Sequence, residues 1–292
     1  MQSDAHANIS FPKPVRNGLR RVYAKLASFK TSDFVNERLF APSTYLLNRN
    51  GKLMRPTLVL IGAYVLGSNP IDFVDLAVAS ELLHTSSLIH DDMIDDDMVR
   101  RGSASVHVKY GGKVALLAGD ALISKAVSLT AQYGERVLKS MTNASMDMCA
   151  GEVVDYEFQN KKYVPSLEQY LEVAFLKSAS LIGACLNSAA VYGKYVSAKK
   201  LYESGTDLGM AFQIRDDIFD FASDNGKGRG GVVGPNVITS IQKEWKMDRT
   251  SAIAKAIELN NYYIEKSKAR MKGMNNADLL SKYAEFIRVK EQ

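Results

Sequence analysis

The stretch Leu88-Ile-His-Asp-Asp-Met-Ile-Asp-Asp-Asp-Met-Val-Arg-Arg-Gly102 holds five aspartates and two arginines. Apolar residues recur at helical spacing before it, so Asp91 and Asp95 are expected on one face at the end of a helix. Aspartate is a poor residue inside a helix, and carboxylates so close together repel one another. Because Mg²⁺ prefers a few carboxylate oxygens together with water and substrate phosphates, the stretch predicts a metal site, with a solvated acidic turn as the alternative.

A second acidic set follows much later in the chain, in Gly209-Met-Ala-Phe-Gln-Ile-Arg-Asp-Asp-Ile-Phe-Asp220. Four polar residues fall at i, i+3, i+4 and i+7 of a helix, namely Gln213, Asp216, Asp217 and Asp220. Their neighbours are largely apolar, so much of this helix should be buried, and buried carboxylates need cations or hydrogen-bond donors. Two Asp-Asp-x-x-Asp sets therefore favour a metal site over an acidic turn.

The rest of the sequence indicates an all-α fold. Two long intervals, 71–164 and 166–234, contain no proline, and their apolar residues recur at helical spacing with little strict alternation. We find no internal repeat or low-complexity linker. We therefore expect a flexible tail over residues 1–10 and a single-domain bundle of many helices over residues 11–292.

Turn-forming dipeptides mark the expected helix boundaries. Asn69-Pro70 is typical of a helix start, with proline at the first helical position. Asn17-Gly18, Asn50-Gly51 and Asn225-Gly226 lack alternating strands on either side, so we interpret them as breaks between helices rather than as hairpin turns. The glycine-rich patch 226–234 is expected to be a loop.

Composition excludes few function classes. The 292 residues carry a formal charge of +5, with 46% hydrophobic and 24% charged residues, as in a soluble protein with a real core. The positive charge weakly favours anionic partners. Cys149 and Cys185 form no disulfide framework or zinc spacing, which fits a reducing cytoplasm. We expect no membrane-spanning segment and no signal peptide.

Basic residues complete the chemistry of the two acidic sets. Lys52 and Arg55 lie three residues apart at a predicted loop-to-helix junction, where a phosphate also meets free backbone donors. Arg100, Arg101 and Lys177 add further cations, and arginine forks suit phosphate oxygens. Any one of these residues is more often only a surface charge, but together with the two acidic sets they indicate a diphosphate-binding site.

With these motifs the chain resembles the trans-type isoprenyl diphosphate synthases, and geranylgeranyl diphosphate synthases in particular. The matching motifs are, in order, Gly51-Lys52…Arg55-Pro56, Glu81-Leu-Leu-His84, His90-Asp91-Asp92…Asp95, Arg100-Arg101-Gly102, Gly119-Asp120, Gly151-Glu152, Lys177-Ser178, Phe212-Gln213 and Asp216-Asp217…Asp220. The resemblance covers the chain beyond its N-terminal tail. It implies helices of the isoprenoid synthase type around a central cavity, and a homodimer.

The resemblance also implies a role for each matching position. Three Mg²⁺ ions per site would be bound by Asp91, Asp95, Asp216 and Asp220, with Asp92 and Asp217 in support. The metals would hold the allylic diphosphate together with Arg100, Lys177 and Gln213, beside Ser178, which stands where the family usually has threonine. The diphosphate of isopentenyl diphosphate would be held by Lys52, Arg55, His84 and Arg101.

The implied reaction is ionisation of the allylic diphosphate, condensation with isopentenyl diphosphate and loss of a proton. In this family the residues four and five positions before the first aspartate help to set the floor of the product tunnel. Here they are Ser87 and Ser86, with Leu83 a turn below. None of the three is aromatic, so we expect a geranylgeranyl or longer product. We also expect peripheral contact with a membrane during product release.

One segment departs from the family pattern. In Gly226–Thr239 the chain keeps Gly226-Lys227, but Val232 stands near the expected aspartate and a later lysine is missing. Lys227, Arg229 or Lys243 would have to compensate. The departure leaves open reduced activity as a lone chain, or dependence on a partner as a subunit of a heteromeric synthase.

Other functions fit less well. A class I terpene cyclase would share the bundle and the first aspartate set, but it would usually lack the second set and the isopentenyl-binding residues. Glu81-x-x-His84 is one half of a di-iron motif, and the sequence holds no second half. A nucleic-acid binder would interleave basic residues with exposed aromatic residues, a pattern that we do not find.

Overall fold

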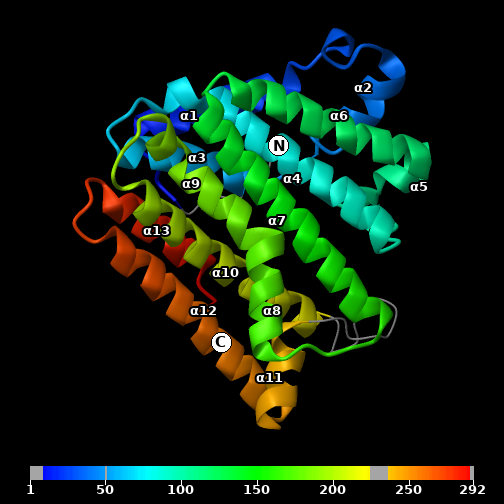
Figure 1. Cartoon of the computed structure of the whole chain (residues 1–292), viewed down its shortest axis with the longest axis vertical. Coiled ribbons are helices and arrows are strands. Elements are labelled where there is room, and N and C mark those ends of the chain that lie inside the picture. Colours follow the sequence, from blue (N-terminus) through cyan, green and yellow to red (C-terminus); the bar gives the residue numbers. More distant parts are fainter. Residues whose placement is uncertain (1–8, 50, 224–235, 290–292) are drawn as a thin grey trace. The chain divides into compact units, whose positions relative to one another are not determined.

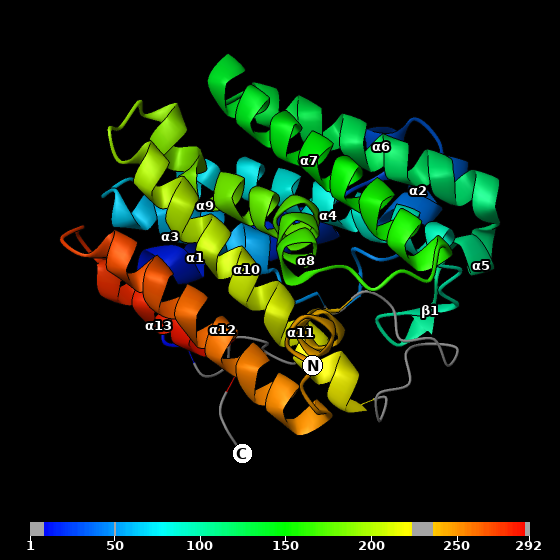
Figure 2. The same ribbon diagram turned by 60° about the horizontal axis from the view of Figure 1, so that its bottom comes forward.

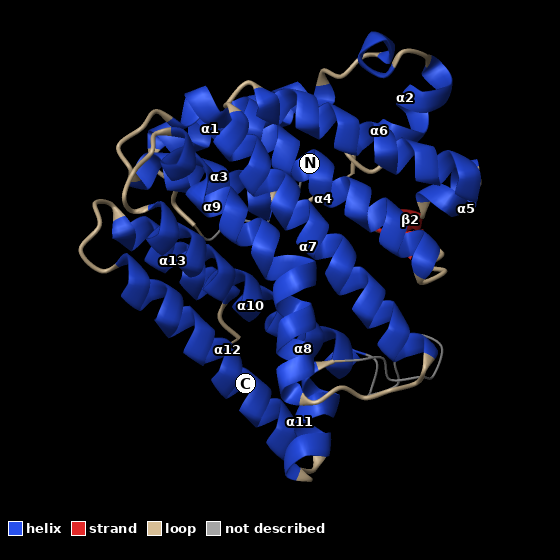
Figure 3. Cartoon of the chain, viewed as in Figure 1, coloured by secondary structure: helices blue, strands red, loops and turns tan. Residues whose placement is uncertain are grey.

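The computed structural model describes residues 9–49, 51–223 and 236–289. Helices make up almost all of its regular structure, which confirms the all-α class (Figures 1 and 3). The chain divides into two compact units. Unit 1 comprises Met1–Thr142 and Ser188–Tyr195, and unit 2 comprises Asn143–Asn187 and Val196–Gln292.

Unit 1 is built around two buried helices. Its elements are α1 (Lys13–Ala27), η1 (Thr31–Phe34), α2 (Glu37–Thr44), α3 (Met54–Val65), η2 (Pro70–Phe73), α4 (Val74–Ile94), β1 (Val99–Arg100), β2 (Ser103–Ala104), α5 (Val106–Tyr110), α6 (Gly112–Ala131) and the start of α7 (Glu135–Asn160). Every residue of α3 except Tyr64 is buried. Helix α4 packs against α6 and α3 (Figure 2).

The start of α4 follows the prediction. The side chain of Asn69 accepts a hydrogen bond from the backbone N–H of Ile71, and Pro70 opens the short helix η2 that leads into α4. Helix α4 is apolar on most sides and therefore buried, as is usual for a core helix. Its last turn brings Asp91 and Asp92 to the end of the core.

The break predicted at Asn17-Gly18 is wrong, because both residues lie inside α1. A Cβ atom at Gly18 would lie 3.0 Å from Cδ1 of Leu60, so glycine at this position allows α1 to approach α3 closely. Tertiary packing explains this glycine, and no turn is needed. Gly51 does lie between two helices, as expected, whereas Asn225-Gly226 falls outside the described residues.

A short hairpin in unit 1 was not predicted. Strands β1 and β2 pair Val99 with Ala104 and Arg100 with Ser103. Arg101 and Gly102 make the turn with positive φ angles of 52° and 71°. Two-residue strands are too short to show an alternating pattern in the sequence. The hairpin fixes the backbone of the two predicted arginines.

Unit 2 is organised around α10. Its elements are most of α7 and α9 (Ser180–Tyr192), α8 (Leu167–Ala174), the π-helical turn η3 (Phe175–Ala179), α10 (Ala198–Ser223), α11 (Val237–Trp245), α12 (Arg249–Met271) and α13 (Ala277–Ile287). Helices α10 and α12 run side by side (Figure 2), and Ile214, Ile218 and Ile241 lie in the apolar core of this unit.

Two helical stretches among the described residues pass a test of length and composition for a membrane span, which by itself does not overturn the expectation that the chain has none. In Leu167–Tyr192, 78% of the apolar 18-residue stretch that passes the test is buried inside the protein, as in the core helix of a soluble protein. In Gly112–Ala131 only 39% is buried, because one side of α6 carries exposed apolar side chains. Length and composition alone are weak evidence for a membrane span.

Candidate active site

The first aspartate set lies where α4 ends in unit 1. Asp91 and Asp92 are in the last turn of the helix, and Asp95 follows its last residue, with its backbone N–H donating to the carbonyl of Asp91 at 2.8 Å. Asp92 is completely buried, Asp91 is partly exposed and Asp95 is exposed. The outer two aspartates of the set are thus reachable from solvent, and the middle one is not.

Arg100 of the hairpin neutralises the buried member of this set. Its guanidinium forms an ion pair with Asp92 and donates a second hydrogen bond to Asp97 at 2.9 Å. Burial raises the pKa of Asp92, and Arg100 works against that rise. Oδ2 of Asp92 is buried without a hydrogen-bond partner among the described residues. The structure therefore places Arg100, predicted to bind the allylic diphosphate, in a network with carboxylates.

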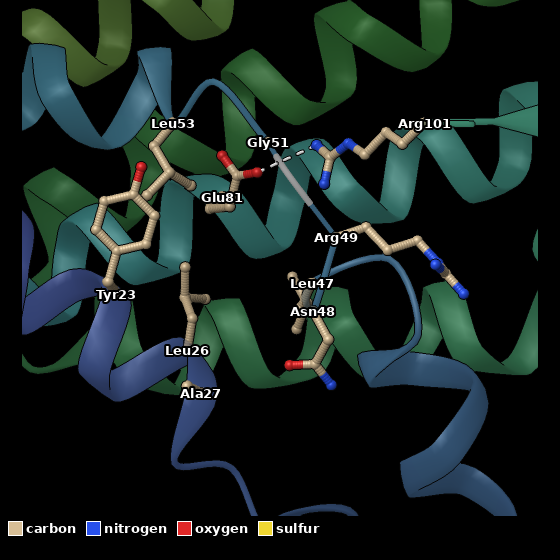
Figure 4. Close-up of a pocket in the computed structure, with 10 residues that line it drawn as sticks. All are labelled: Tyr23, Leu26, Ala27, Leu47, Asn48, Arg49, Gly51, Leu53, Glu81 and Arg101. Carbon is tan, nitrogen blue, oxygen red and sulfur yellow. Dashed lines mark hydrogen bonds and ion pairs between the residues drawn. The ribbon is translucent and has the colours of Figure 1, made fainter. Parts of the chain in front are cut away.

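Arg101 lines a cavity of about 230 Å³ in unit 1 (Figure 4). Its guanidinium donates to the carbonyl of Leu46 at 3.0 Å and to the carboxylate of Glu81 at 3.3 Å. Glu81 is almost completely buried; burial raises its pKa, although Arg101 and Arg55 oppose the rise. Sequence reasoning identified Glu81 only as part of the Glu81-x-x-His84 motif. The signal that could have identified Glu81 as the partner of a nearby cation is a carboxylate on an apolar helix, three residues before His84.

The remaining unit 1 residues lie on α3, its preceding loop and α4. Lys52 is exposed just before α3, and Arg55 is buried in its first turn. His84 has a pKa well below its ordinary value, first because of burial and then because of nearby arginines, so its imidazole is neutral at pH 7. Leu83 and Ser86 are buried on α4, and Ser87 is partly buried on the same helix.

The second aspartate set lies on α10 in unit 2. Asp216 is partly exposed beside Arg215, and Asp220 is exposed. Asp217 accepts hydrogen bonds from Nε2 of Gln213 at 2.9 Å and from the backbone N–H of Val237, the first residue of α11, at 3.0 Å. Burial raises the pKa of Asp217 to about 6 despite these bonds.

Lys177 lies on the π-helical turn η3, a rare feature that is often found at functional sites. Its ammonium is 2.8 Å from Glu152 and is also paired with Asp155. Burial would lower the pKa of Lys177, but the two carboxylates raise it above its ordinary value. A Cβ atom at Gly151 would lie 2.7 Å from the backbone nitrogen of Lys177, so glycine brings α7 close enough for Glu152 to reach the lysine.

Three of the predicted unit 2 residues line a cavity of about 60 Å³, whereas Asp216 and Asp220 do not. Its lining includes Asp155, Tyr170, Lys177, Gln213 and Asp217. Ser178 joins this group, since its hydroxyl donates to Oε1 of Gln213 at 2.6 Å. Sequence reasoning missed Asp155 and Tyr170 as site residues. Asp155 follows Glu152 at helical spacing, which was a usable signal, whereas nothing in the sequence marks Tyr170.

Of the segment that departs from the family pattern, only its last residues are described. Lys227, Arg229 and Val232 fall outside the described residues. Lys243, named as a possible substitute for the missing lysine, lies on α11, where its ammonium contacts the carbonyl of Val164 and lies 4.4 Å from the ring centre of Tyr163. In this arrangement Lys243 is held by the loop before α8.

The two aspartate sets suit a metal that arrives together with a phosphate ligand. Within the described ranges, no group of three or more His, Cys, Asp or Glu side chains could hold a metal ion. Each set instead offers two solvent-reachable carboxylates, Asp91 with Asp95 and Asp216 with Asp220. Mg²⁺ is usually bound by one or two carboxylates, with water and substrate phosphates completing its octahedron. The donor set therefore fits Mg²⁺.

Comparison with known proteins defines the class of protein. Residues 36–233 match the Polyprenyl synthetase family. The chain is 36% identical over 251 residues to a short chain isoprenyl diphosphate synthase of Methanothermobacter thermautotrophicus, covering 82% of this chain and 74% of the relative. It is also 36% identical over 228 residues to a geranylgeranyl diphosphate synthase of Methanosarcina mazei, covering 73% and 70%.

Structural similarity points to the same fold. The geranylgeranyl pyrophosphate synthetase of Geoglobus acetivorans superposes with a TM-score of 0.86 over 95% of this chain and all of that chain, at 24% sequence identity. The chain belongs to the Polyprenyl synthetase family, whose members are prenyltransferases. The resemblance drawn from its motifs and the isoprenoid synthase fold are therefore confirmed.

Proposed function

We propose that this prenyltransferase condenses isopentenyl diphosphate with an allylic diphosphate, giving geranylgeranyl diphosphate or a longer product. The observation that carries the proposal is the pair of aspartate sets, each with two solvent-reachable outer carboxylates and a middle aspartate that accepts hydrogen bonds within its own unit; Asp92 is buried and Asp217 is partly buried. The names of the curated relatives, which include short-chain and geranylgeranyl diphosphate synthases, support this class of substrate.

We assign binding of isopentenyl diphosphate to unit 1. Lys52, Arg55 and Arg101 supply positive charge for its diphosphate, and the loop before α3 supplies backbone donors. His84 is neutral, so it serves as a hydrogen-bond donor rather than as a cation.

We assign Lys177 and Gln213 of unit 2 to the allylic diphosphate, and the outer aspartates of both sets to Mg²⁺, three ions per active site. When bound, the metal would stabilise the charge that develops on the leaving diphosphate. Lys177 stays protonated because of its two carboxylate partners, and it orients the diphosphate by a charge-assisted hydrogen bond. Binding requires the lysine to exchange Asp155 or Glu152 for a phosphate oxygen. The proposed reaction requires that water, which would quench the allylic cation, be excluded when both substrates are bound.

Product length would be set by small residues on α4. Ser86 is buried and Ser87 is partly buried, one turn before the first aspartate set. We expect Ser86→Phe to shorten the main product, because an aromatic ring would fill space that the growing chain needs. The products would be sized by chromatography, and a thermal melt would show how much stability the larger ring costs, about 1–3 kcal/mol for overpacking. An unchanged product from a folded variant would place the tunnel floor elsewhere.

The activity is tested by incubating the purified chain with Mg²⁺, labelled isopentenyl diphosphate and, in separate reactions, dimethylallyl, geranyl, farnesyl and geranylgeranyl diphosphates. A discrete prenyl product confirms the enzyme and gives its length class. Product formed from an allylic diphosphate without isopentenyl diphosphate would instead indicate a terpene cyclase. No incorporation with any primer would indicate a subunit that needs a partner chain.

We further propose a homodimer formed through α6. Val114, Leu116, Leu117 and Val127 on this helix are between 36% and 58% exposed, an apolar surface that a second copy would cover. Light scattering should give twice the chain mass for the wild type. Leu117→Lys should shift the protein toward monomer, whereas a dimer unaffected by this change would need another interface.

The basic face of α1 supports peripheral contact with an anionic membrane during product release, in a cytoplasmic enzyme. Lys13, Arg16, Arg20 and Arg21 are exposed, and the helix contains no acidic residue. Its apolar side is buried in unit 1, so attraction would be electrostatic and would weaken as salt screens it. Sedimentation with vesicles of anionic and of neutral lipid tests this contact.

A further inference from the structure

Two positive charges share one tyrosine ring in unit 1. The guanidinium carbon of Arg49 lies 4.1 Å from the ring centre of Tyr45, and the ammonium of Lys109 lies 4.2 Å from the same point. Lys109 is also 5.2 Å from the ring centre of Tyr110, which meets Tyr45 edge to face. The hydroxyl of Tyr45 donates to the carbonyl of Ala104 at 3.0 Å and fixes the ring. We call Arg49, Tyr45 and Lys109 the cation stack.

The cation stack contains no negative charge. The distances to the ring centre place the two cationic groups within about 8 Å of each other. Neither Arg49 nor Lys109 forms an ion pair with a carboxylate in the described part of the chain. An aromatic face attracts each cation but does not neutralise it. Like charges held this close are therefore expected to attract an anion.

The position of the stack indicates which anion. Arg49 lies two residues before Gly51, at the loop to which we assign the diphosphate of isopentenyl diphosphate, and it lines the same cavity as Arg101. Figure 4 shows Arg101 facing Glu81, while the Arg49 side chain extends away from that carboxylate. Among the described residues that line the cavity, Glu81 is the one carboxylate, and it is already paired with Arg101.

Arg49 also has hydrogen-bonding capacity to spare. Its Nε atom is buried and has no hydrogen-bond partner in the ranges that the structure covers. A guanidinium stacked on a ring is held in place, while its edge N–H groups remain directed outward for phosphate oxygens. Lys109 is exposed on α5 and is free to move toward a ligand.

We propose that the cation stack extends the isopentenyl diphosphate site and binds the terminal phosphate of that substrate. The inference rests on the proposed assignment of isopentenyl diphosphate to unit 1. It adds Arg49 and Lys109 as residues that determine affinity for this substrate, with Tyr45 as the residue that positions them.

Steady-state kinetics of Arg49→Gln and Lys109→Gln test the role. Each change removes a charge-assisted hydrogen bond to phosphate, so KM for isopentenyl diphosphate should rise about tenfold. KM for the allylic diphosphate and kcat at saturation should stay within about twofold of the wild type. The matched control is Lys113→Gln, which removes an exposed lysine four residues from Lys109 and should change nothing.

Calorimetry separates this inference from the proposed function. Inorganic diphosphate, titrated without Mg²⁺ or an allylic substrate, should bind about tenfold more weakly to Arg49→Gln than to the wild type, and Arg49→Lys should recover part of the loss. That result would stand even if the chain failed to extend any primer. Normal turnover with an unchanged KM for isopentenyl diphosphate in both variants would overturn the inference. A fall in melting temperature without a change in KM would equally overturn it, because the stack would then be a packing element only.

Discussion

The two aspartate sets share one pattern, but different partners hold their middle aspartates. In each, the outer aspartates are accessible and the middle aspartate is held by a partner from another element of its own unit. In unit 1 that element is the β-hairpin, whose Arg100 pairs with Asp92. In unit 2 it is the start of α11, where the backbone N–H of Val237 donates to Asp217.

The difference lies in the charge of the partner. Asp92 has a cation, so its buried charge is compensated within unit 1. Asp217 has neutral donors from Gln213 and from a helix N-terminus, which reduce the cost of burying its charge without removing it. Its pKa of about 6 reflects that cost. The middle aspartate of each set is thus held by a partner within its own unit, whereas the outer aspartates are accessible to solvent.

The largest effect should come from the outer aspartates. Asp91→Ala or Asp216→Ala should lower kcat by at least about a hundredfold, because each removes a carboxylate proposed to bind Mg²⁺. Helical circular dichroism should be unchanged, since both side chains are partly exposed. Normal turnover in either variant would remove the metal assignment from that set, and loss in one alone would show that the sets are not equivalent.

Substitution of the two middle aspartates should lower the stability of the protein by different amounts. Asp92→Asn leaves Arg100 without its buried partner and should lower the free energy of unfolding by about 3 kcal/mol. Asp217→Asn keeps one acceptor oxygen and removes a charge that is costly to bury, so it should lower stability by about 1 kcal/mol or less. Urea denaturation, followed by circular dichroism, measures both values. Equal losses would mean that the two partners stabilise their aspartates to the same degree.

The smallest effect is a pH dependence specific to Asp217. Its pKa in the folded protein, about 6, lies above the ordinary value of 3.8, so the folded state binds this proton more tightly than the unfolded chain. The resulting stabilisation is fully present below pH 4 and is lost as the pH rises through 6. Between pH 4 and pH 7, in EDTA, the wild type should lose stability relative to Asp217→Asn. If the free energy of unfolding changed with pH in the same way for the two proteins, Asp217 would titrate normally.

Much of this protein could be predicted from its sequence. The proline-free intervals with helical apolar spacing are local features, so they indicated the all-α class and the helix that begins near Asn69-Pro70. The spacing of the second set correctly predicted that Asp216, Asp217 and Asp220 share a helix, whereas Asp95 of the first set lies just beyond the end of α4. The ordered motifs were enough to identify the family.

Tertiary structure decided what each charged residue contacts. Arg100 and Arg101 are adjacent in sequence, yet the hairpin directs one to Asp92 and the other to Glu81. Gly18 looks like a helix break until its packing against Leu60 is seen. The sequence by itself determined the all-α class and the kinds of side chain in each aspartate set, because both follow from local residue pattern. Burial and ion pairing depend on elements distant in the chain, so only the folded structure could show which carboxylates are neutralised and which remain accessible to solvent.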